Sequence, residues 1–244
     1  MIKKIDSKNN QKIISCFKLK NPSYRNDKKL FLSEGIYNLK MALEENIVKE
    51  IYTLSPLDFV DENIIQYIVN EDIIKKLSSS KNPQGIIFVS SFINKTINQN
   101  NHLVYLDNVQ DPGNLGTIIR TALALNYDGV ILSKGCCSIY NDKVIASSKG
   151  AIYKIPICEG NISDFKNTHK IISSTLKDSS ISLNEISKID KFVVCFGNES
   201  HGISLDVESN SDIFIKIPMS NIDSLNVAVS AGIILYKIKE IGDF

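Results

Sequence analysis

The chain has 244 residues, enough for one large domain or two modest ones. Hydrophobic residues make up 43% and charged residues 23%, which is typical of soluble globular proteins, and no apolar run approaches the ~20 residues that span a bilayer. The N-terminal segment MIKKIDSKNN has no apolar core, so we expect neither a secretory signal nor a membrane protein.

The cysteines and histidines give no sign of a metal site or of a disulfide framework. His102 and His169 have no partners at the spacing of metal ligands, so no metal is expected. The cysteines are odd in number and lack CxxC spacing, which favours free thiols in a reducing cytoplasm. They are Cys16, Cys136, Cys137, Cys158 and Cys195.

The net charge of +1 is unevenly distributed along the chain. Residues 1–95 hold 15 basic and 11 acidic residues, a balance of +4, and residues 96–244 hold 13 and 16, a balance of −3. A basic leading segment indicates a polyanionic partner, of which nucleic acid is the commonest. A solvated, lysine-rich helix explains the charge equally well at this point.

Residues 1–92 predict a small α/β domain. An amphipathic helix is expected within 7–20 and is ended by the turn sequence Asn21-Pro22-Ser23. The next elements are expected to be a strand at 30–32, a helix opened by Glu34-Gly35, strands at 48–54 and 64–69, a helix at 71–77 and a buried strand at 85–89. The polar, aperiodic stretch that follows indicates a linker, which we place at 93–101.

Residues 102–244 predict a second α/β domain with a parallel sheet. Near-continuous apolar strands separated by helices are typical of a sheet that is covered on both faces. Strands are expected at 103–107, 129–132, 152–156, 171–175, 192–196 and 213–217. Helices are expected at 115–126, 141–149 and 225–239.

Three polar segments follow strands of this second domain, where the sites of open parallel sheets collect. They are DPGNLGTIIR at 111–120, FGNESHGI at 196–203 and IPMSNIDSLNVAVSAG at 217–232. In the third, we expect Ser224 to cap the C-terminal helix and Asn226 to lie in its first turn. There is no GxGxxG and no GxxxxGK[ST], and Asn198 occupies a position that the GxSxG elbow requires to be glycine.

One side chain of the first segment is unusual for this composition. Of 28 basic residues only Arg25 and Arg120 are arginines. A planar, permanently charged fork is needed where lysine does not serve, so both arginines are candidates for functional positions. A solvated charge on a helix is the alternative interpretation.

The order PGNLGTIIR, FGNESHGI and IPM…SLNVAVSAG resembles the three signature motifs of the SpoU (TrmH) branch of the SPOUT RNA methyltransferases. The segment YR…FLSEG…AL within 24–50 is similar to the small substrate-binding domain of the rRNA-modifying members. The resemblance implies a domain at 1–92 that binds RNA, and at 102–244 a parallel-sheet α/β catalytic domain with a trefoil knot, working as a homodimer. It also implies transfer of the methyl group of S-adenosylmethionine to a ribose 2′-hydroxyl of RNA.

The resemblance assigns roles to individual residues. Asn114, Arg120, Glu199, Ser224 and Asn226 match the catalytic positions, with Glu199 holding Arg120. The cofactor positions are Gly197, Ile217 and Leu225, with Thr175, Leu176 and Met219 as further candidates for the same pocket. RNA contacts are expected from Arg25, Lys28 and Lys29.

Arginine keeps its proton in proteins, so stabilising the ribose oxyanion suits Arg120 better than acting as a general base. Ribosomal RNA is the expected substrate because of the N-terminal domain. Transfer RNA, or a non-catalytic RNA-binding protein with a decayed site, are the alternatives.

Overall fold

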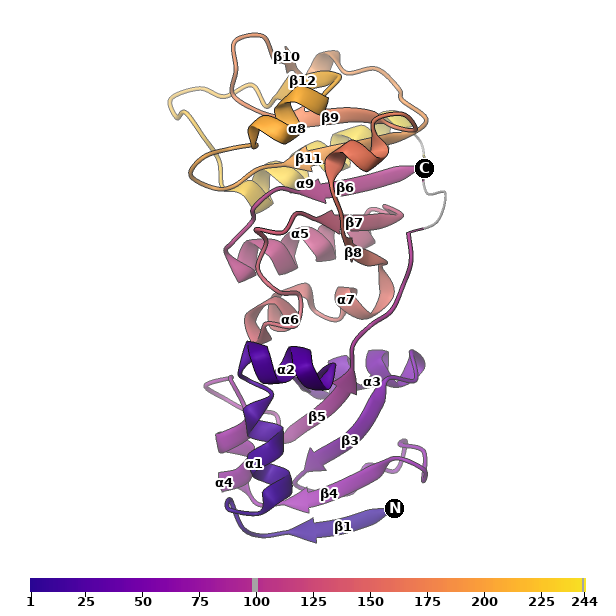
Figure 1. The fold of residues 1–244 in the computed structure, drawn as a ribbon, viewed down its shortest axis with the longest axis vertical. Coiled ribbons are helices and arrows are strands. Elements are labelled where there is room, and N and C mark those ends of the chain that lie inside the picture. The colour runs from indigo at the N-terminus through magenta and orange to yellow at the C-terminus, as the bar shows by residue number, and fades with distance from the viewer. Residues whose placement is uncertain (98–100, 243) are drawn as a thin grey trace. The chain divides into compact units, whose positions relative to one another are not determined.

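The computed structural model describes residues 1–97, 101–242 and 244 (Figure 1). The chain divides into two compact units, the first comprising Met1–Asn94 with Tyr140–Ile145 and the second Lys95–Ile139 with Ala146–Phe244. The predicted linker at 93–101 lies partly outside the described residues. The domain boundaries at 92 and 102 stay a prediction, and the division differs from them in giving Tyr140–Ile145 to the first unit.

The first unit is built on a mixed five-stranded sheet in the order β1-β4-β3-β5-β2. β1, β4 and β3 run parallel to one another, whereas β5 is antiparallel to both of its neighbours. The strands are β1 (Ile2–Ile5), β2 (Leu30–Glu34), β3 (Val48–Thr53), β4 (Ile65–Val69) and β5 (Ile86–Ser91). The helices are α1 (Gln11–Lys18), α2 (Pro22–Lys28), α3 (Ile36–Glu44) and α4 (Glu71–Leu77).

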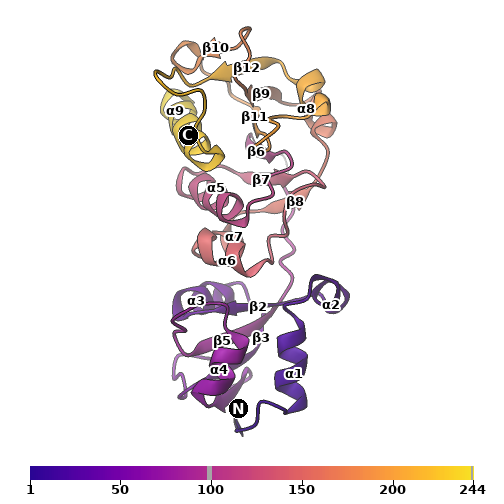
Figure 2. The same cartoon turned by 90° about the vertical axis from the view of Figure 1, so that its left-hand side faces the viewer.

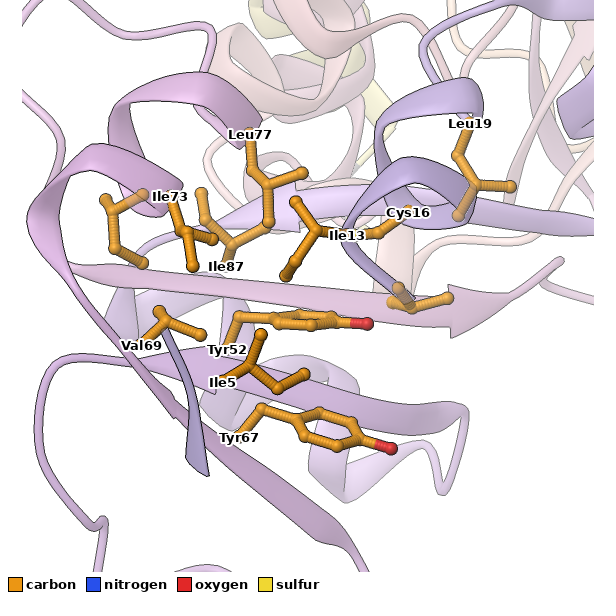
Figure 3. Close-up of a cluster of buried hydrophobic side chains, with 12 residues drawn as sticks. Ile5, Ile13, Cys16, Leu19, Tyr52, Tyr67, Val69, Ile73, Leu77 and Ile87 are labelled. Atoms are coloured by element: carbon orange, nitrogen blue, oxygen red, sulfur yellow. The ribbon is translucent and has the colours of Figure 1, made fainter. Parts of the chain in front are cut away.

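One buried cluster of this unit lies between the sheet and the helices α1 and α4. Figure 3 shows Ile13 of α1 and Leu77 of α4 beside the ring of Tyr52. The Tyr52 ring stacks on that of Tyr67 of the neighbouring strand, with centroids 5.1 Å apart. The predicted amphipathic helix is therefore confirmed, and its apolar face is the one that the sheet buries.

Two elements of the first unit were not predicted. Pro22 does not simply end a helix but begins α2, where its fixed φ suits the first helical position and the Asn21 side chain accepts from the Tyr24 N–H at 3.2 Å. The strand β1 is short, and three of its four residues are exposed. Its sequence lacks the alternation of buried and exposed residues that predicts a strand, because only Ile5 is buried.

The second unit contains a seven-stranded sheet in the order β10-β12-β9-β11-β6-β7-β8, and every neighbouring pair is parallel. The strands are β6 (His102–Leu106), β7 (Gly129–Leu132), β8 (Ile157–Glu159), β9 (Lys170–Ser174), β10 (Ile181–Ser182), β11 (Phe192–Phe196) and β12 (Ile213–Lys216). The helices are α5 (Pro112–Ala124), α6 (Asp142–Ser148), α7 (Ala151–Lys154), α8 (Leu205–Asn210) and α9 (Val227–Gly242), with 3-10 turns at Ile162–Phe165 and Leu183–Glu185.

Helices cover both faces of this parallel sheet. Figure 2 shows α5 and α9 on one side of the strands and α8 on the other. β11 is buried at all five positions, as expected for a strand in the middle of such a sheet. The predicted parallel α/β fold is confirmed, while the trefoil knot stays a prediction.

The strand predicted at 152–156 is wrong. Residues Ala151–Lys154 form the short helix α7, and the strand β8 begins only at Ile157. Lys95 Nζ donates to the carbonyl oxygens of Tyr153 at 2.7 Å and Lys154 at 3.2 Å, which satisfies groups that a helix end leaves free. A short apolar run fits a buried helix turn as well as a strand, so the pattern could not separate the two.

Among the described residues, no helix combines the length and apolarity that a membrane crossing requires. All five cysteines are free. No group of three or more histidine, cysteine or acidic side chains lies close enough to hold a metal ion in the part of the chain that the structure describes.

Neighbouring isoleucines of α1 test the packing of the first unit. Ile13 is fully buried, whereas Ile14 is partly exposed. We expect Ile13→Ala to lower the free energy of unfolding by about 2–5 kcal/mol, because it removes packed methyl groups and leaves a cavity. Ile14→Ala should cost clearly less in urea denaturation. Equal losses would contradict the described packing.

Candidate active site

The three motif segments meet at one edge of the second unit's sheet. β12, β9, β11 and β6 are adjacent and parallel, so their carboxyl ends lie along the same edge. The register pairs Phe196 with Leu106 at the ends of β11 and β6. Loops that start beyond these ends are therefore neighbours in space, although they are distant in the sequence.

The first motif places its polar residues at the beginning of α5. Asp111 is the N-cap, and its Oδ1 accepts from the Asn114 N–H at 2.8 Å. Pro112 occupies the first helical position, where a missing N–H costs nothing. Because Asp111 performs the capping, the Asn114 side chain is free to bond elsewhere.

The side chain of Asn114 joins the other two motifs. Its Nδ2 donates to Glu199 Oε1 at 2.9 Å, and its Oδ1 accepts from Asn226 Nδ2 at 3.0 Å. One amide thus uses both its donor and its acceptor, which defines its orientation. Three of the five predicted catalytic residues lie together.

The cap of the C-terminal helix differs from the prediction. Asn226 is the capping residue, since its Oδ1 accepts from the N–H groups of Ala228 at 2.9 Å and Val229 at 3.3 Å. Ser224 is exposed and makes no hydrogen bond among the described residues. The prediction that Ser224 caps this helix is therefore wrong, because the helix begins only at Val227.

Arg120 lies away from this network within the single chain. It is exposed on α5, six residues after Asn114, which places it about 120° around the helix axis and roughly 9 Å along it. Among the described residues no ion pair joins Arg120 to Glu199, whose carboxylate accepts from Asn114 instead. The expectation that Glu199 holds Arg120 is thus not met inside one chain.

The loop that carries Glu199 is held by a close backbone contact. A Cβ added to Gly197 would lie 2.1 Å from the carbonyl carbon of Gly202, so only glycine fits there. Asn198 and Gly202 exchange backbone hydrogen bonds of 2.8 and 2.9 Å. Gly202 itself has a φ of +70°. The buried Gly197 therefore has a steric role, whatever it does for a cofactor.

Two residues that support the site were missed from the sequence. Asp107 follows β6, is only 3% exposed, and accepts from the Ser204 N–H at 2.6 Å. The next residue, Asn108, accepts through its carbonyl oxygen from Asn198 Nδ2 at 2.9 Å. The second contact ties the end of β6 to the loop of Glu199, and the first ties it to the start of α8 just beyond that loop. A polar pair directly after a buried strand was the available signal.

The predicted cofactor residues also lie at this edge. Thr175 and Leu176 follow β9, and Ile217 and Met219 follow β12. Leu176 is 58% exposed, while Ile217, Met219 and Leu225 are half-buried. Aliphatic side chains left partly exposed beside polar loops offer apolar surface to a flat heteroaromatic ring. This residue set fits an adenosyl group.

The predicted RNA-binding residues of the first unit divide into two kinds. Lys28 is exposed and pairs with Asp27 at 3.0 Å, and Lys29 is exposed with its Nζ 5.5 Å from the Phe92 ring centroid. Both stay predicted RNA contacts. Arg25, in contrast, is only 6% exposed.

The burial of Arg25 corrects the prediction that it contacts RNA. Its guanidinium donates to the Leu19 carbonyl oxygen at 3.4 Å. Burial lowers the pKa of Arg25, and the nearby Asp142 carboxylate opposes that shift. Arginine is rare in this chain, which predicted a special position for Arg25, but that position lies in the interior.

Glycine substitutions test the loop of Glu199. We expect Gly197→Ala to lower the urea midpoint more than Gly202→Ala, because the first forces backbone atoms apart. The second only places a side chain at positive φ, at about 1 kcal/mol, with no atom within 4 Å of the new Cβ. A Gly197→Ala protein as stable as Gly202→Ala would contradict the close contact.

Comparison with known proteins agrees with this geometry. Residues 101–236 match the SpoU rRNA Methylase family, and residues 10–87 match the MRM3-like substrate binding domain. The 23S rRNA (guanosine(2553)-2'-O)-methyltransferase RlmP of Bacillus subtilis (strain 168) is 31% identical over 98% of this chain and 100% of its own length.

Solved structures show the same architecture. An AdoMet-bound rRNA methyltransferase from Sinorhizobium meliloti superposes with a TM-score of 0.88 at 25% identity, covering 98% of both chains. The SpoU methyltransferase AviRb from Streptomyces viridochromogenes superposes with a TM-score of 0.82 at 21% identity, covering 95% of this chain and 98% of that one, and shares the fold. The chain belongs to the SpoU rRNA methylase family.

Proposed function

We propose that this chain transfers the methyl group of S-adenosylmethionine to a ribose 2′-hydroxyl of ribosomal RNA. The observation that carries the proposal is the pair of hydrogen bonds that Asn114 donates to Glu199 and accepts from Asn226, which joins the three motifs at one edge of the parallel sheet. The family supplies the class of enzyme, an RNA 2′-O-methyltransferase. The cytoplasmic location stays a prediction.

The proposed cofactor pocket is the edge formed by the loops after β9, β11 and β12. Bound S-adenosylmethionine supplies an electrophilic methyl group on a sulfonium. We assign its adenosyl and methionine parts to Gly197, Ile217 and Leu225, with Thr175, Leu176 and Met219 lining the same pocket. The AdoMet-bound rRNA methyltransferase from Sinorhizobium meliloti, which superposes over 98% of both chains, supports this assignment.

The polar residues act by positioning the ribose. Methyl transfer is an in-line displacement, so much of the acceleration comes from holding the reacting atoms in line. Asn114 is fixed by two hydrogen bonds and keeps a second amide hydrogen for a ligand. The Ser224 hydroxyl is exposed at the same segment as Asn226. Both can bond the ribose without rearranging the loops.

Arg120 is proposed to stabilise the ribose oxygen as it loses its proton. A guanidinium stays protonated in proteins and presents a flat fork of donors, so it suits an oxyanion better than it suits a base. In the single chain Arg120 projects from a different face of α5 than Asn114. We therefore propose a homodimer in which the site is completed by the second copy.

The surface of α9 supports a dimer. Val229, Ile233 and Tyr236 are 50%, 40% and 59% exposed and recur at helical spacing along one stripe. α9 packs beside α5, which carries Arg120. An exposed apolar stripe beside the site fits contact with another copy of the chain.

Ribosomal RNA is proposed over transfer RNA because the substrate-binding match covers residues 10–87 of the first unit and the Bacillus subtilis relative aligns over 98% of the chain. The test is ribose-methylation mapping on ribosomal and transfer RNA from cells with and without the gene. We expect one methylated ribose to disappear from ribosomal RNA. Loss from transfer RNA alone would reject the proposed substrate, and no loss from either would reject the proposed reaction.

Variants of Arg120 test its proposed role. Because the side chain is exposed and has no ion pair among the described residues, Arg120→Ala and Arg120→Lys should leave the melting temperature unchanged. We expect turnover to fall at least 100-fold in both variants, since lysine keeps the charge but not the fork. S-adenosylmethionine affinity, measured by calorimetry, should stay within about threefold. Turnover near that of the natural enzyme would refute the role.

A further inference from the structure

A half-exposed aromatic ring on α1 is flanked by two lysines. Phe17 is 43% exposed, and the Nζ atoms of Lys20 and Lys76 lie 5.5 and 5.8 Å from its ring centroid. Both ammonium groups are held by main-chain oxygens, Lys20 by Ser78 at 2.7 Å and Lys76 by Lys8 at 2.8 Å. Neither forms an ion pair with a carboxylate among the described residues. The two ammonium groups are thus held beside the ring, and the nearby carboxylates of Asp142 and Glu34 act electrostatically on that of Lys20.

A second ring, on the adjacent helix α2, is also flanked by two lysines, and it is partly buried against the core of the first unit. The Nζ atoms of Lys18 and Lys28 lie 6.0 and 5.7 Å from the ring centroid of Tyr24. Lys28 also pairs with Asp27, but both groups are well exposed, and such pairs are weak. Lys18 has no carboxylate partner in the part of the chain that the structure describes. Two aromatic rings with a surplus of positive charge therefore follow one another along α1 and α2.

Another exposed phenylalanine of the same unit lacks this charge. Phe59 is 47% exposed and has Lys40 Nζ 5.4 Å from its ring centroid. Its sequence neighbours are acidic, namely Asp58, Asp61 and Glu62. Phe59 therefore resembles Phe17 in its exposed fraction and in having a lysine near its ring. The charged residues around Phe59, however, sum to a negative charge, whereas those around Phe17 sum to a positive one. Phe59 provides a matched control.

We propose that the surface around Phe17 and Tyr24 binds single-stranded RNA, with unpaired bases stacked on the two rings and the lysines against the adjoining phosphates. The inference rests on the proposed function, which makes RNA the substrate. The residues of this α1–α2 surface are Phe17, Lys18, Lys20, Tyr24, Lys28 and Lys76.

The chemistry favours a single strand over a duplex. Bases inside a duplex stack on one another and present no free face, whereas unpaired bases stack on aromatic side chains. Lysine is a compact, flexible charge that suits phosphates of a mobile backbone. Ring stacking reads no particular base, so the surface holds a strand without selecting its sequence.

The test uses the full-length protein, a fluorescein-labelled U12 strand and a labelled 16-base-pair RNA duplex in anisotropy titrations. Phe17→Leu/Tyr24→Leu keeps apolar bulk but removes the aromatic faces, and should weaken U12 binding about 10- to 30-fold. Phe59→Leu should stay within about twofold. The duplex affinity should change little in both proteins.

The lysines are tested by salt dependence. Lys20→Gln/Lys76→Gln should make the slope of log K against log salt shallower by about 1.4 for U12, because two phosphate contacts are lost. Lys40→Gln should leave the slope unchanged. Equal slopes for the natural protein and Lys20→Gln/Lys76→Gln would overturn the assignment of phosphates to these lysines.

Other outcomes overturn the surface as a whole. They are failure of the natural protein to bind U12, U12 affinities that match between Phe17→Leu/Tyr24→Leu and Phe59→Leu, and equal weakening on strand and duplex. Methyl transfer to ribosomal RNA is measured on the same preparations. If the natural protein transfers methyl groups and any of these outcomes is found, the proposed RNA-binding surface is rejected and the proposed function stands. If the natural protein transfers no methyl group to ribosomal RNA, the proposed function is rejected. The U12 titrations then still show whether the α1–α2 surface binds single-stranded RNA.

Discussion

The arrangement of the site depends on one amide. Asn114 donates to Glu199 and accepts from Asn226, so a single side chain joins the start of α5 to two segments that lie 85 and 112 residues away in the sequence. An amide suits this position because it offers a donor and an acceptor on one planar group, whereas a carboxylate offers only acceptors. Asp111 makes this possible by capping α5 itself, which leaves the Asn114 side chain unused by its own helix.

The parallel sheet explains why these loops can meet. Parallel neighbours place their carboxyl ends at one edge, and the buried Asp107 then ties the end of β6 to Ser204, beyond the loop of Glu199. The close approach of Gly197 and Gly202 fixes the shape of that loop from within. The loop that carries Glu199 is thus held both by hydrogen bonds and by a close backbone contact, so its polar side chains are preorganised without a ligand.

The sequence predicted helices and strands well where the spacing of apolar residues matches the residues that the fold buries. The helix at 71–77 has acidic residues in its first turn, lysines in its last and a capping Asn70, and its observed bounds are those predicted. The prediction failed at 152–156, where a lysine from outside the segment satisfies the carbonyl groups of a short helix. It failed for Arg25 because rarity of a residue type says that its position is special but not whether it is inside or outside. Asp107 was missed because its partner lies 97 residues away.

The charges of the first unit also show that the number of lysines in the sequence and their positions in the structure give different information. The surplus of +4 in residues 1–95 gave the sign of a partner, but it treats all lysines alike. In the structure Lys12 faces Glu50 and Lys75 faces Glu71, so their charges are locally balanced. Lys20 and Lys76, in contrast, are held by main-chain oxygens, which orient an ammonium group without cancelling its charge. The lysines beside the exposed ring of Phe17 therefore differ from Lys12 and Lys75 in having no carboxylate at ion-pair distance among the described residues, which leaves them available to a polyanion.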